Sequence, residues 1–174
     1  MSEIFSYSRI NTFKNCRELY HINYIQGIRK ENENIEAYLG SCVHHVIEDI
    51  YENNNQIINF DEIIYMYDKT WKDRWHDNVY LIDRTKKVDQ YYNLGIECLR
   101  NFYKKNIQDN SSFLKNVVDC ELEVKFSMDG IQFRGFIDRL DFNPDTNQYT
   151  VIDYKTSKRI ISSKKAKRDL QLGL

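Results

Sequence analysis

Hydrophobic positions in the first 110 residues recur mainly at helical spacing. Three segments carry such a pattern clearly, at about residues 39–52, 61–75 and 84–107. An earlier helix is predicted to begin at a Ser8 cap and to end near Gly27. Its apolar positions are Ile10, Phe13, Leu19, Ile22 and Ile25. This part of the chain is therefore predicted to be mainly helical.

The pattern changes near residue 113 to one typical of strands. β-branched and aromatic residues fill three segments, 117–126, 131–142 and 149–154. The turn signals Met-Asp-Gly at 128–130 and Asn-Pro-Asp at 143–145 separate them, which predicts a three-stranded meander. A lysine-rich segment from Ser162 predicts a last helix, still running at Leu174. We expect one α/β domain over residues 1–174, helical to about 112, with the meander and core in about 113–174.

Two of the predicted strands each carry an aspartate near the middle, a position that strand propensity disfavours. If residues 143–148 form the loop, residues whose numbers sum to 291 lie opposite each other, and Asp138 faces Asp153. Carboxylates so placed repel each other, and a divalent cation between them removes the conflict. Lys155 shares the face of Asp153, where its ammonium could stabilise charge on a phosphate. The hairpin therefore predicts a metal-dependent phosphodiesterase site.

The same hairpin has a second interpretation of equal weight. Charged strand residues often form a solvated ladder of ion pairs. Asp138 would then pair with Arg139 or Arg134, and Asp153 with Lys155. The hairpin alone leaves both interpretations open.

Charge and cysteine content narrow the class of protein. The 25 basic and 26 acidic residues exclude a globally basic coat for nucleic acid, so phosphate has to be attracted by a local patch. Residues 155–168, with seven basic residues and no acidic one, are either that patch or a solvated terminal helix. Four cysteines without a CxxC pair argue against a zinc ribbon and a disulfide framework. No apolar run approaches the roughly 20 residues of a membrane span, so we expect a cytoplasmic protein with no membrane partner.

Four stretches, in the same order, resemble the RecB-like branch of the PD-(D/E)XK nuclease superfamily. The segment SYSRINTFKNCRELYHINYI is similar to the opening helix of that family, and Gly40-Ser41-Cys42-Val43-His44 to its glycine and histidine motif. The core acidic and lysine positions are matched by Gly135, Asp138, Asp153 and Lys155. Gln171 begins what looks like the glutamine-to-tyrosine motif. Together the four stretches span nearly the whole chain.

The resemblance implies a restriction-endonuclease-like α/β core, with a mixed sheet flanked by helices. It implies Asp138, Asp153, Lys155 and Gln171 as catalytic residues. It also implies His44, Asp138 and Asp153 as metal ligands, with the carbonyl of residue 154 beside them. Oxygen ligands with one imidazole suit Mg²⁺ tolerably and Mn²⁺ well.

Other acidic and imidazole groups are expected to lie outside this centre. Glu121 and Glu123 alternate to one side of the first strand, and we expect them to form its solvated face in preference to reaching the site. His45 shares its helix face with Asp49 and Glu52, which predicts an ion-paired histidine.

The sequence departs from the family pattern at two places. Arg17 stands where many relatives have proline after the cysteine, which affects the start of a helix. The tyrosine due four residues after Gln171 would be residue 175, so we expect the core to be cut short at the C-terminus. Relatives in one branch bind an iron-sulfur cluster through one cysteine near the opening helix and three near the end. Cys16 fits the first position, but this chain alone is not expected to hold such a cluster.

The function implied is that of a metal-dependent DNA nuclease, more specifically an exonuclease in DNA repair, recombination or CRISPR adaptation. Single-stranded DNA is a candidate substrate, and a helicase or CRISPR-adaptation protein a candidate partner. Five aromatic residues could stack bases, but core positions are the preferred interpretation of Tyr7, Tyr20, Tyr24, Trp71 and Trp75. The alternative function is a non-catalytic nucleic-acid-binding domain or an inactive fragment of a larger helicase-nuclease.

Overall fold

The computed structural model describes residues 3–28, 31–52, 59–108, 110, 114–157 and 162. It divides into two compact units. One comprises Glu31–Leu122 and Ile137–Thr156, and the other Met1–Lys30, Glu123–Phe136 and Ser157–Leu174. The first unit contains three long helices. The second contains the N-terminal segment and the tip of a β-hairpin.

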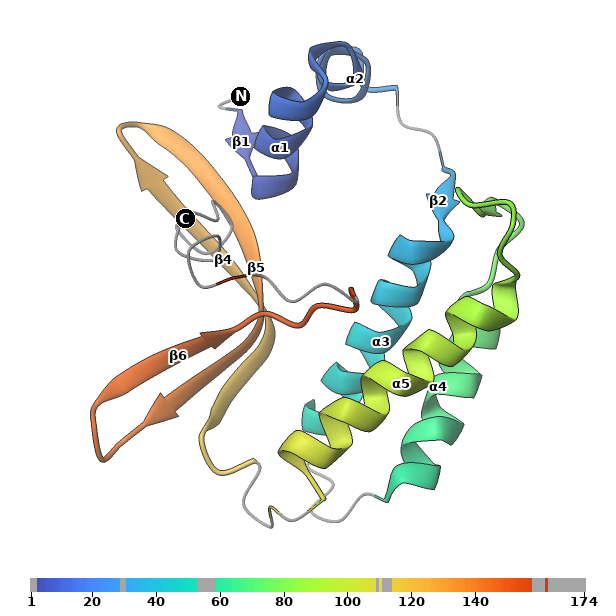
Figure 1. Ribbon diagram of the computed structural model, residues 1–174. Helices are drawn as coiled ribbons and strands as arrows, with labels where there is room; N and C mark the ends of the chain where they lie inside the picture. The colour runs from blue at the N-terminus through green and yellow to red at the C-terminus, as the bar shows by residue number, and fades with distance from the viewer. Residues whose placement is uncertain are drawn as a thin grey trace. The chain divides into compact units, whose positions relative to one another are not determined.

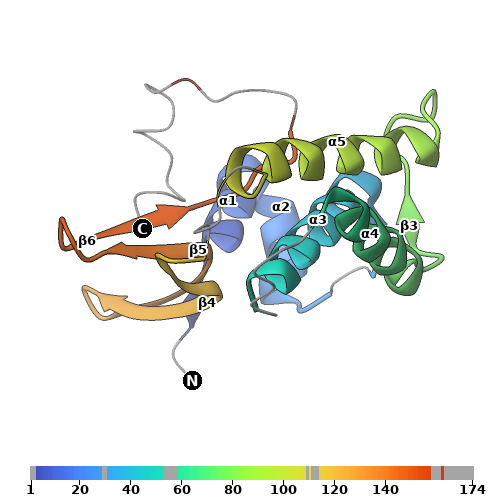
Figure 2. The same cartoon turned by 90° about the horizontal axis from the view of Figure 1, so that it is seen from below.

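Three helices lie side by side in the first unit (Figure 1). They are α3 (Ile35–Glu52), α4 (Phe60–Arg74) and α5 (Val88–Asn106). They confirm the helices predicted near residues 39–52, 61–75 and 84–107. The Asn59 side chain begins α4 with a capping box that includes Glu62. Figure 2 shows the same three helices from below.

The core of this unit is built around α3. Its predicted apolar face is buried, together with further positions on the same helix. The buried residues of α3 are Ile35, Tyr38, Leu39, Cys42, Val43, Val46, Ile47, Ile50 and Tyr51. Trp71 from α4 and Leu99 from α5 complete the packing. Among the predicted core aromatics, Trp71 is buried, whereas Trp75 is 40% exposed and Tyr7, Tyr20 and Tyr24 are partly exposed.

A long central strand organises the sheet. This strand, β5 (Ile131–Asn143), pairs with β4 (Val117–Met128) and antiparallel with β6 (Gln148–Ile152). It also pairs in parallel with the short β1 (Ile4–Phe5), which makes the sheet mixed. A separate parallel pair joins β2 (Glu33–Asn34) to β3 (Val79–Tyr80). The predicted meander and mixed sheet are thus confirmed.

Both predicted turns of the meander are present. Asp129 and Gly130 have φ angles of 52° and 80°, as a two-residue hairpin turn with left-handed backbone requires. At the other turn the Asn143 side chain accepts hydrogen bonds from the backbone N–H groups of Asp145 and Thr146. The register between β5 and β6 follows the predicted sum of 291, from Asn143 opposite Gln148 to Arg139 opposite Ile152.

The prediction of one continuous N-terminal helix from a Ser8 cap was wrong. Ser6 is the cap of α1 (Tyr7–Asn15), and Cys16 then adopts an extended conformation. The chain continues as α2 (Arg17–Tyr20) and a π-helical turn, η1 (His21–Ile25). The apolar positions Phe13 and Leu19 are six residues apart, a gap that does not fit one helix, and the break lies between them. Arg17 indeed begins a helix.

The C-terminal predictions lie outside the described residues. These are the last helix from Ser162, with its basic residues beyond 157, and Gln171. The single-domain organisation stays a prediction. In the part of the chain that the structure describes, no helix combines the length and the apolar character needed to cross a bilayer.

Candidate metal centre

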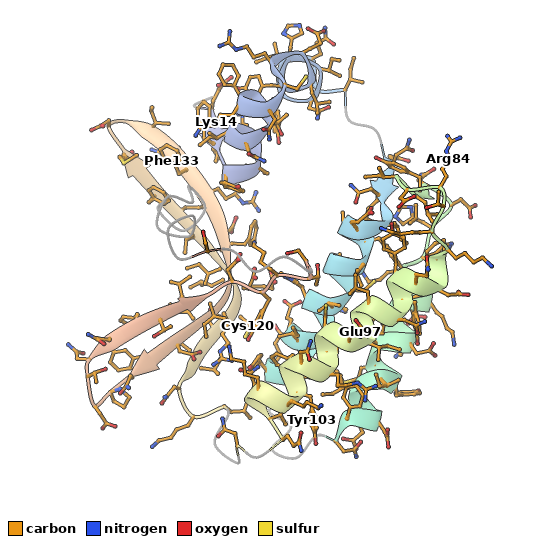
Figure 3. All side chains as sticks on the ribbon, viewed as in Figure 1. Lys14, Arg84, Glu97, Tyr103, Cys120 and Phe133 are labelled. Carbon is orange, nitrogen blue, oxygen red and sulfur yellow. The ribbon has the colours of Figure 1, made fainter. Side chains whose placement is uncertain are left out.

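Three side chains from different elements meet in the first unit. His44 lies on α3, Glu121 on β4 and Asp138 on β5. The Nδ1 atom of His44 is 3.6 Å from Glu121 Oε1 and 3.7 Å from Asp138 Oδ2. One ligand atom from each residue lies within 4.8 Å of the other two. Cys120, labelled on β4 in Figure 3, directly precedes Glu121 and packs against the helical core.

The backbone of Tyr154 fixes the orientation of the His44 ring. The Nε2 atom of His44 is 3.0 Å from the Tyr154 carbonyl oxygen. A carbonyl only accepts hydrogen bonds, so Nε2 carries the proton. In the neutral ring Nδ1 then presents its lone pair to the two carboxylates, the form in which an imidazole binds a metal ion.

The same residue also holds Asp138. The backbone N–H of Tyr154 donates to Asp138 Oδ2 at 2.6 Å. The Asp138 side chain is only 13% exposed, and burial raises its pKa, although this hydrogen bond and His44 act in the opposite direction. The negative charge of Asp153 raises the pKa of Asp138 further.

Glu121 adds a third negative group that the sequence analysis placed elsewhere. Burial raises the pKa of Glu121, and the charge of Asp138 raises it further, whereas His44 acts in the opposite direction through its charge and a hydrogen bond. Burial and mutual repulsion therefore oppose the ionisation of the two carboxylates, and His44 offsets this only in part. A divalent cation would reverse the effect by stabilising both charged forms.

The expectation that Glu121 lies with Glu123 on a solvated face was wrong for Glu121. Its backbone φ is 48°, in the left-handed region that a strand residue with a long side chain rarely adopts. Such a local distortion redirects a side chain that alternation would place elsewhere. Glu123 instead forms ion pairs with Lys125, at 3.0 Å, and with Arg134.

Asp153 and Lys155 lie immediately after β6. The Nζ atom of Lys155 is 2.8 Å from Asp153, so this part of the ion-pair ladder is present. The rest of the ladder is absent among the described residues, because Arg139 pairs with Asp141 and Arg134 with Glu123. Asp138 faces His44 in place of an arginine.

The helix that carries His44 approaches the segment after Lys155. A Cβ added at Gly40, one turn before His44, would lie 3.5 Å from Thr156 Oγ1. His45 lies apart from the centre, and its ring nitrogens are 3.4 Å from Glu48 and 3.9 Å from Asp49. Its predicted pairing with Asp49 is confirmed, and Glu48 is the second acidic partner in place of the predicted Glu52.

The donor set fits a divalent cation. It offers one imidazole nitrogen and carboxylate oxygens, and the ordered neighbour Tyr154 orients two of the three side chains. Oxygen-rich sites with one nitrogen suit Mn²⁺ and tolerate Mg²⁺. Asp153 is the nearest further carboxylate in the sequence motif, and its negative charge acts on Asp138.

Nothing in the sequence distinguishes Glu121 from its neighbours. Asp119, Glu121 and Glu123 alternate along one strand, and all three are acidic. The local backbone conformation brings Glu121 into the centre, and no glycine or proline near residue 121 predicts that conformation from the sequence.

An α/β fold with a mixed sheet and a centre of imidazole, carboxylates and a nearby lysine defines a restriction-endonuclease-like nuclease domain. The model of the PD-(D/E)XK nuclease superfamily matches residues 4–174, and the chain belongs to that superfamily. Its members are metal-dependent nucleases that hydrolyse phosphodiester bonds, so the substrate class is nucleic acid. A comparison with curated proteins gives no significant match.

Proposed function

We propose that this chain is a deoxyribonuclease of the RecB-like branch, an exonuclease that requires Mn²⁺ or Mg²⁺. One observation carries the proposal. The Nδ1 atom of His44 faces Glu121 and Asp138, while its other nitrogen is held by the Tyr154 carbonyl. This is the arrangement of a ligand imidazole that is oriented by a neighbouring acceptor.

Asp138, Glu121 and His44 would hold the cation, and Asp153 would join them from the end of β6. The bound cation would polarise the phosphodiester and favour attack by water. The Tyr154 carbonyl would remain the acceptor for His44, a role that differs from the direct ligand implied by the family resemblance.

Lys155 would neutralise negative charge on the phosphate. Its ammonium is 2.8 Å from Asp153, so it is held beside the carboxylates by an existing ion pair. Preorganised positive charge of this kind stabilises a transition state without further rearrangement. Gln171 would help to orient the same centre.

DNA is the proposed substrate, with single-stranded DNA among its forms. The resemblance in motif order supports DNA, and the seven basic residues of 155–168 would contact its phosphates. A helicase or CRISPR-adaptation protein is the proposed partner, on the resemblance alone.

The proposal is tested with end-labelled single- and double-stranded DNA, and RNA of the same sequence, each with Mg²⁺, Mn²⁺ or EDTA. We expect metal-dependent shortening of DNA from one end. Asp153→Ala and Lys155→Ala should abolish it, whereas His45→Ala, next to His44 but outside the centre, should not. Cleavage that persists in both of the first two variants contradicts the assignment.

Calorimetric titration distinguishes an enzyme from a scaffold that only binds nucleic acid. The proposed nuclease should bind Mn²⁺ saturably, and Asp138→Asn should weaken this binding strongly. DNA binding without any saturable Mn²⁺ binding would favour the scaffold.

A further inference from the structure

We propose that Arg139 is a positioning residue of the metal centre and acts through Tyr154. The inference rests on the proposed function, because it assigns a role in organising the same centre. Arg139 follows Asp138 on β5, so the two side chains leave the strand on opposite faces. Asp138 reaches the centre directly, whereas Arg139 reaches the side chain of Tyr154.

The Arg139 guanidinium is itself fixed from several sides. Its Nε atom donates to Asp141 Oδ1 at 2.6 Å, and Nη2 donates to Asp141 Oδ2, which makes the pair bidentate. The guanidinium carbon lies 4.8 Å from the centroid of the Tyr51 ring, and Nη1 donates to the Tyr51 hydroxyl. The Arg139 and Asp141 side chains are only 11% and 17% exposed. A bidentate pair of this kind holds the guanidinium in a defined geometry.

Tyr154 connects the Arg139–Asp141 pair to the metal centre. Its hydroxyl accepts from Arg139 Nη1 at 3.2 Å and donates to the Tyr51 hydroxyl at 3.5 Å, and its ring packs edge-on against Phe102 at 5.7 Å. Its backbone N–H holds Asp138, and its carbonyl holds the His44 ring. The side chain is therefore anchored at one end while the backbone orients two proposed ligands at the other.

The position of Tyr154 in the chain makes an anchor necessary. β6 ends at Ile152, so Tyr154 lies beyond the hydrogen-bonded ladder that fixes the preceding residues. The backbone there depends on side-chain contacts and on its bonds to Asp138 and His44. Loss of the hydroxyl anchor would let the Tyr154 backbone shift, and both ligands would shift with it.

The test compares Tyr154 with Tyr91, a tyrosine of the same unit whose hydroxyl donates to Glu36. Tyr154→Phe removes the bonds of its hydroxyl to Arg139 and Tyr51 but keeps the ring, and Tyr91→Phe is the matched control, because it also removes one tyrosine hydroxyl bond to a side chain. Mn²⁺ affinity of the full chain is measured by calorimetry, and stability by urea unfolding. Changes to groups around metal ligands typically weaken affinity roughly 10- to 100-fold. We expect such a loss for Tyr154→Phe and unchanged affinity for Tyr91→Phe.

A second variant removes the anchor from the other side. Arg139→Gln combined with Asp141→Asn neutralises both members of the pair, so no buried charge is left unpaired. It should weaken Mn²⁺ binding as much as Tyr154→Phe does. Adding Tyr154→Phe to this double variant should weaken Mn²⁺ binding little further, because both changes remove the same contact. Wild-type Mn²⁺ affinity in both Tyr154→Phe and the Arg139→Gln/Asp141→Asn variant would overturn the role of Arg139 while leaving the proposed function intact. Absence of saturable Mn²⁺ binding in the wild-type chain would overturn both.

Discussion

Gly95 on α5 lies directly against Tyr67 on α4. A Cβ added at Gly95 would meet the Tyr67 hydroxyl and would lie 2.8 Å from Leu39 Cδ1 on α3. Tyr67 and Leu39 are almost fully buried, at 0% and 2% exposure, so neither can move aside into solvent. The close approach of the three helices that support the metal centre therefore depends on the missing side chain at residue 95.

Gly95→Ala should destabilise the protein. Glycine inside a helix is itself unfavourable by about 1 kcal/mol relative to alanine, but overpacking a core typically costs about 1–3 kcal/mol or more. We expect the clash to dominate and the free energy of unfolding to fall by about 1–3 kcal/mol in urea titrations.

Gly40→Ala is the matched control for that substitution. Gly40 also lies inside a helix, but its added Cβ would meet only Thr156 Oγ1, at an ordinary 3.5 Å. Gly40→Ala should therefore leave stability unchanged or raise it. Equal losses for the two variants would show that the contact with Tyr67 is not the cause.

The Tyr67 hydroxyl gives a related prediction. Within the described residues it is buried without a hydrogen-bond partner, and such a group lowers stability by about 1–3 kcal/mol. Tyr67→Phe should therefore not destabilise the protein, and it should recover part of the loss in Gly95→Ala because it removes the hydroxyl from the clash. Urea unfolding of the two single variants and the double variant measures this. A marked loss in Tyr67→Phe alone would mean that the hydroxyl has a stabilising partner.

Two substitutions separate the charge of Glu121 from its backbone strain. The left-handed conformation at φ 48° costs a residue with a Cβ about 1–2 kcal/mol, and glycine escapes most of that cost. Glu121→Gln removes only the charge, whereas Glu121→Gly removes charge and strain. Both should weaken Mn²⁺ binding. In urea unfolding without metal, Glu121→Gly should be the more stable of the two.

The carboxylates of the centre should make the stability of the metal-free protein, measured in EDTA, fall as the pH rises. The folded-state pKa values of Asp138 and Glu121 are raised, chiefly by burial. As the pH rises from the ordinary carboxyl pKa to these raised values, the unfolded chain loses its protons first, and stability falls. Below that pH window the two carboxyls are protonated in both states and no stability is lost. Above it they are ionised in both states and the loss of stability has its full size.

Mn²⁺ should reverse this trend, because it binds the ionised carboxylates and its affinity rises over the same pH window. Thermal melts between pH 4 and 8, with EDTA or Mn²⁺, measure the difference in sign. Asp138→Asn should flatten the EDTA curve. A wild-type stability that rises with pH in EDTA through this window would contradict the raised pKa values.

Much of this fold follows from local patterns in the sequence. The apolar positions of α3 and the turn residues Asp129 and Asn143 act over a few residues, and the register of β5 and β6 follows from loop length. The break at Cys16 was missed because the apolar positions on either side of it keep helical spacing, and only the gap between Phe13 and Leu19 marks it. The short strand β1 was also missed, since its pairing partner lies more than 120 residues away in the sequence.

The metal centre, too, could be predicted only in part from the sequence. His44 and Asp138 are drawn together as the motif resemblance implied, but their common support by the Tyr154 backbone is a long-range relationship. Glu121 belongs to the centre because of its unusual backbone φ angle. Such an angle is set by the packing around β4, and neither residue type nor spacing reveals it.

The ion pair between Lys155 and Asp153 leads to the last prediction, a separation of metal binding from cleavage. The Lys155 ammonium lies 2.8 Å from Asp153 and is paired with the carboxylate that is proposed to join the metal ligands. Its positive charge also opposes the binding of another cation nearby. Lys155→Gln removes both effects. Calorimetry should therefore show Mn²⁺ binding at least as tight as in the wild-type chain.

Cleavage should respond in the opposite direction. Removal of one group that stabilises transition-state charge typically slows an enzyme about 10²- to 10³-fold, and we expect a loss of this size in single-turnover cleavage of labelled DNA. Lys125→Gln, which removes a lysine paired with Glu123 in the second unit, serves as the control and should leave the rate unchanged. If Lys155→Gln weakens Mn²⁺ binding and cleavage in parallel, the lysine supports the ligands themselves, and its assignment to the phosphate is wrong.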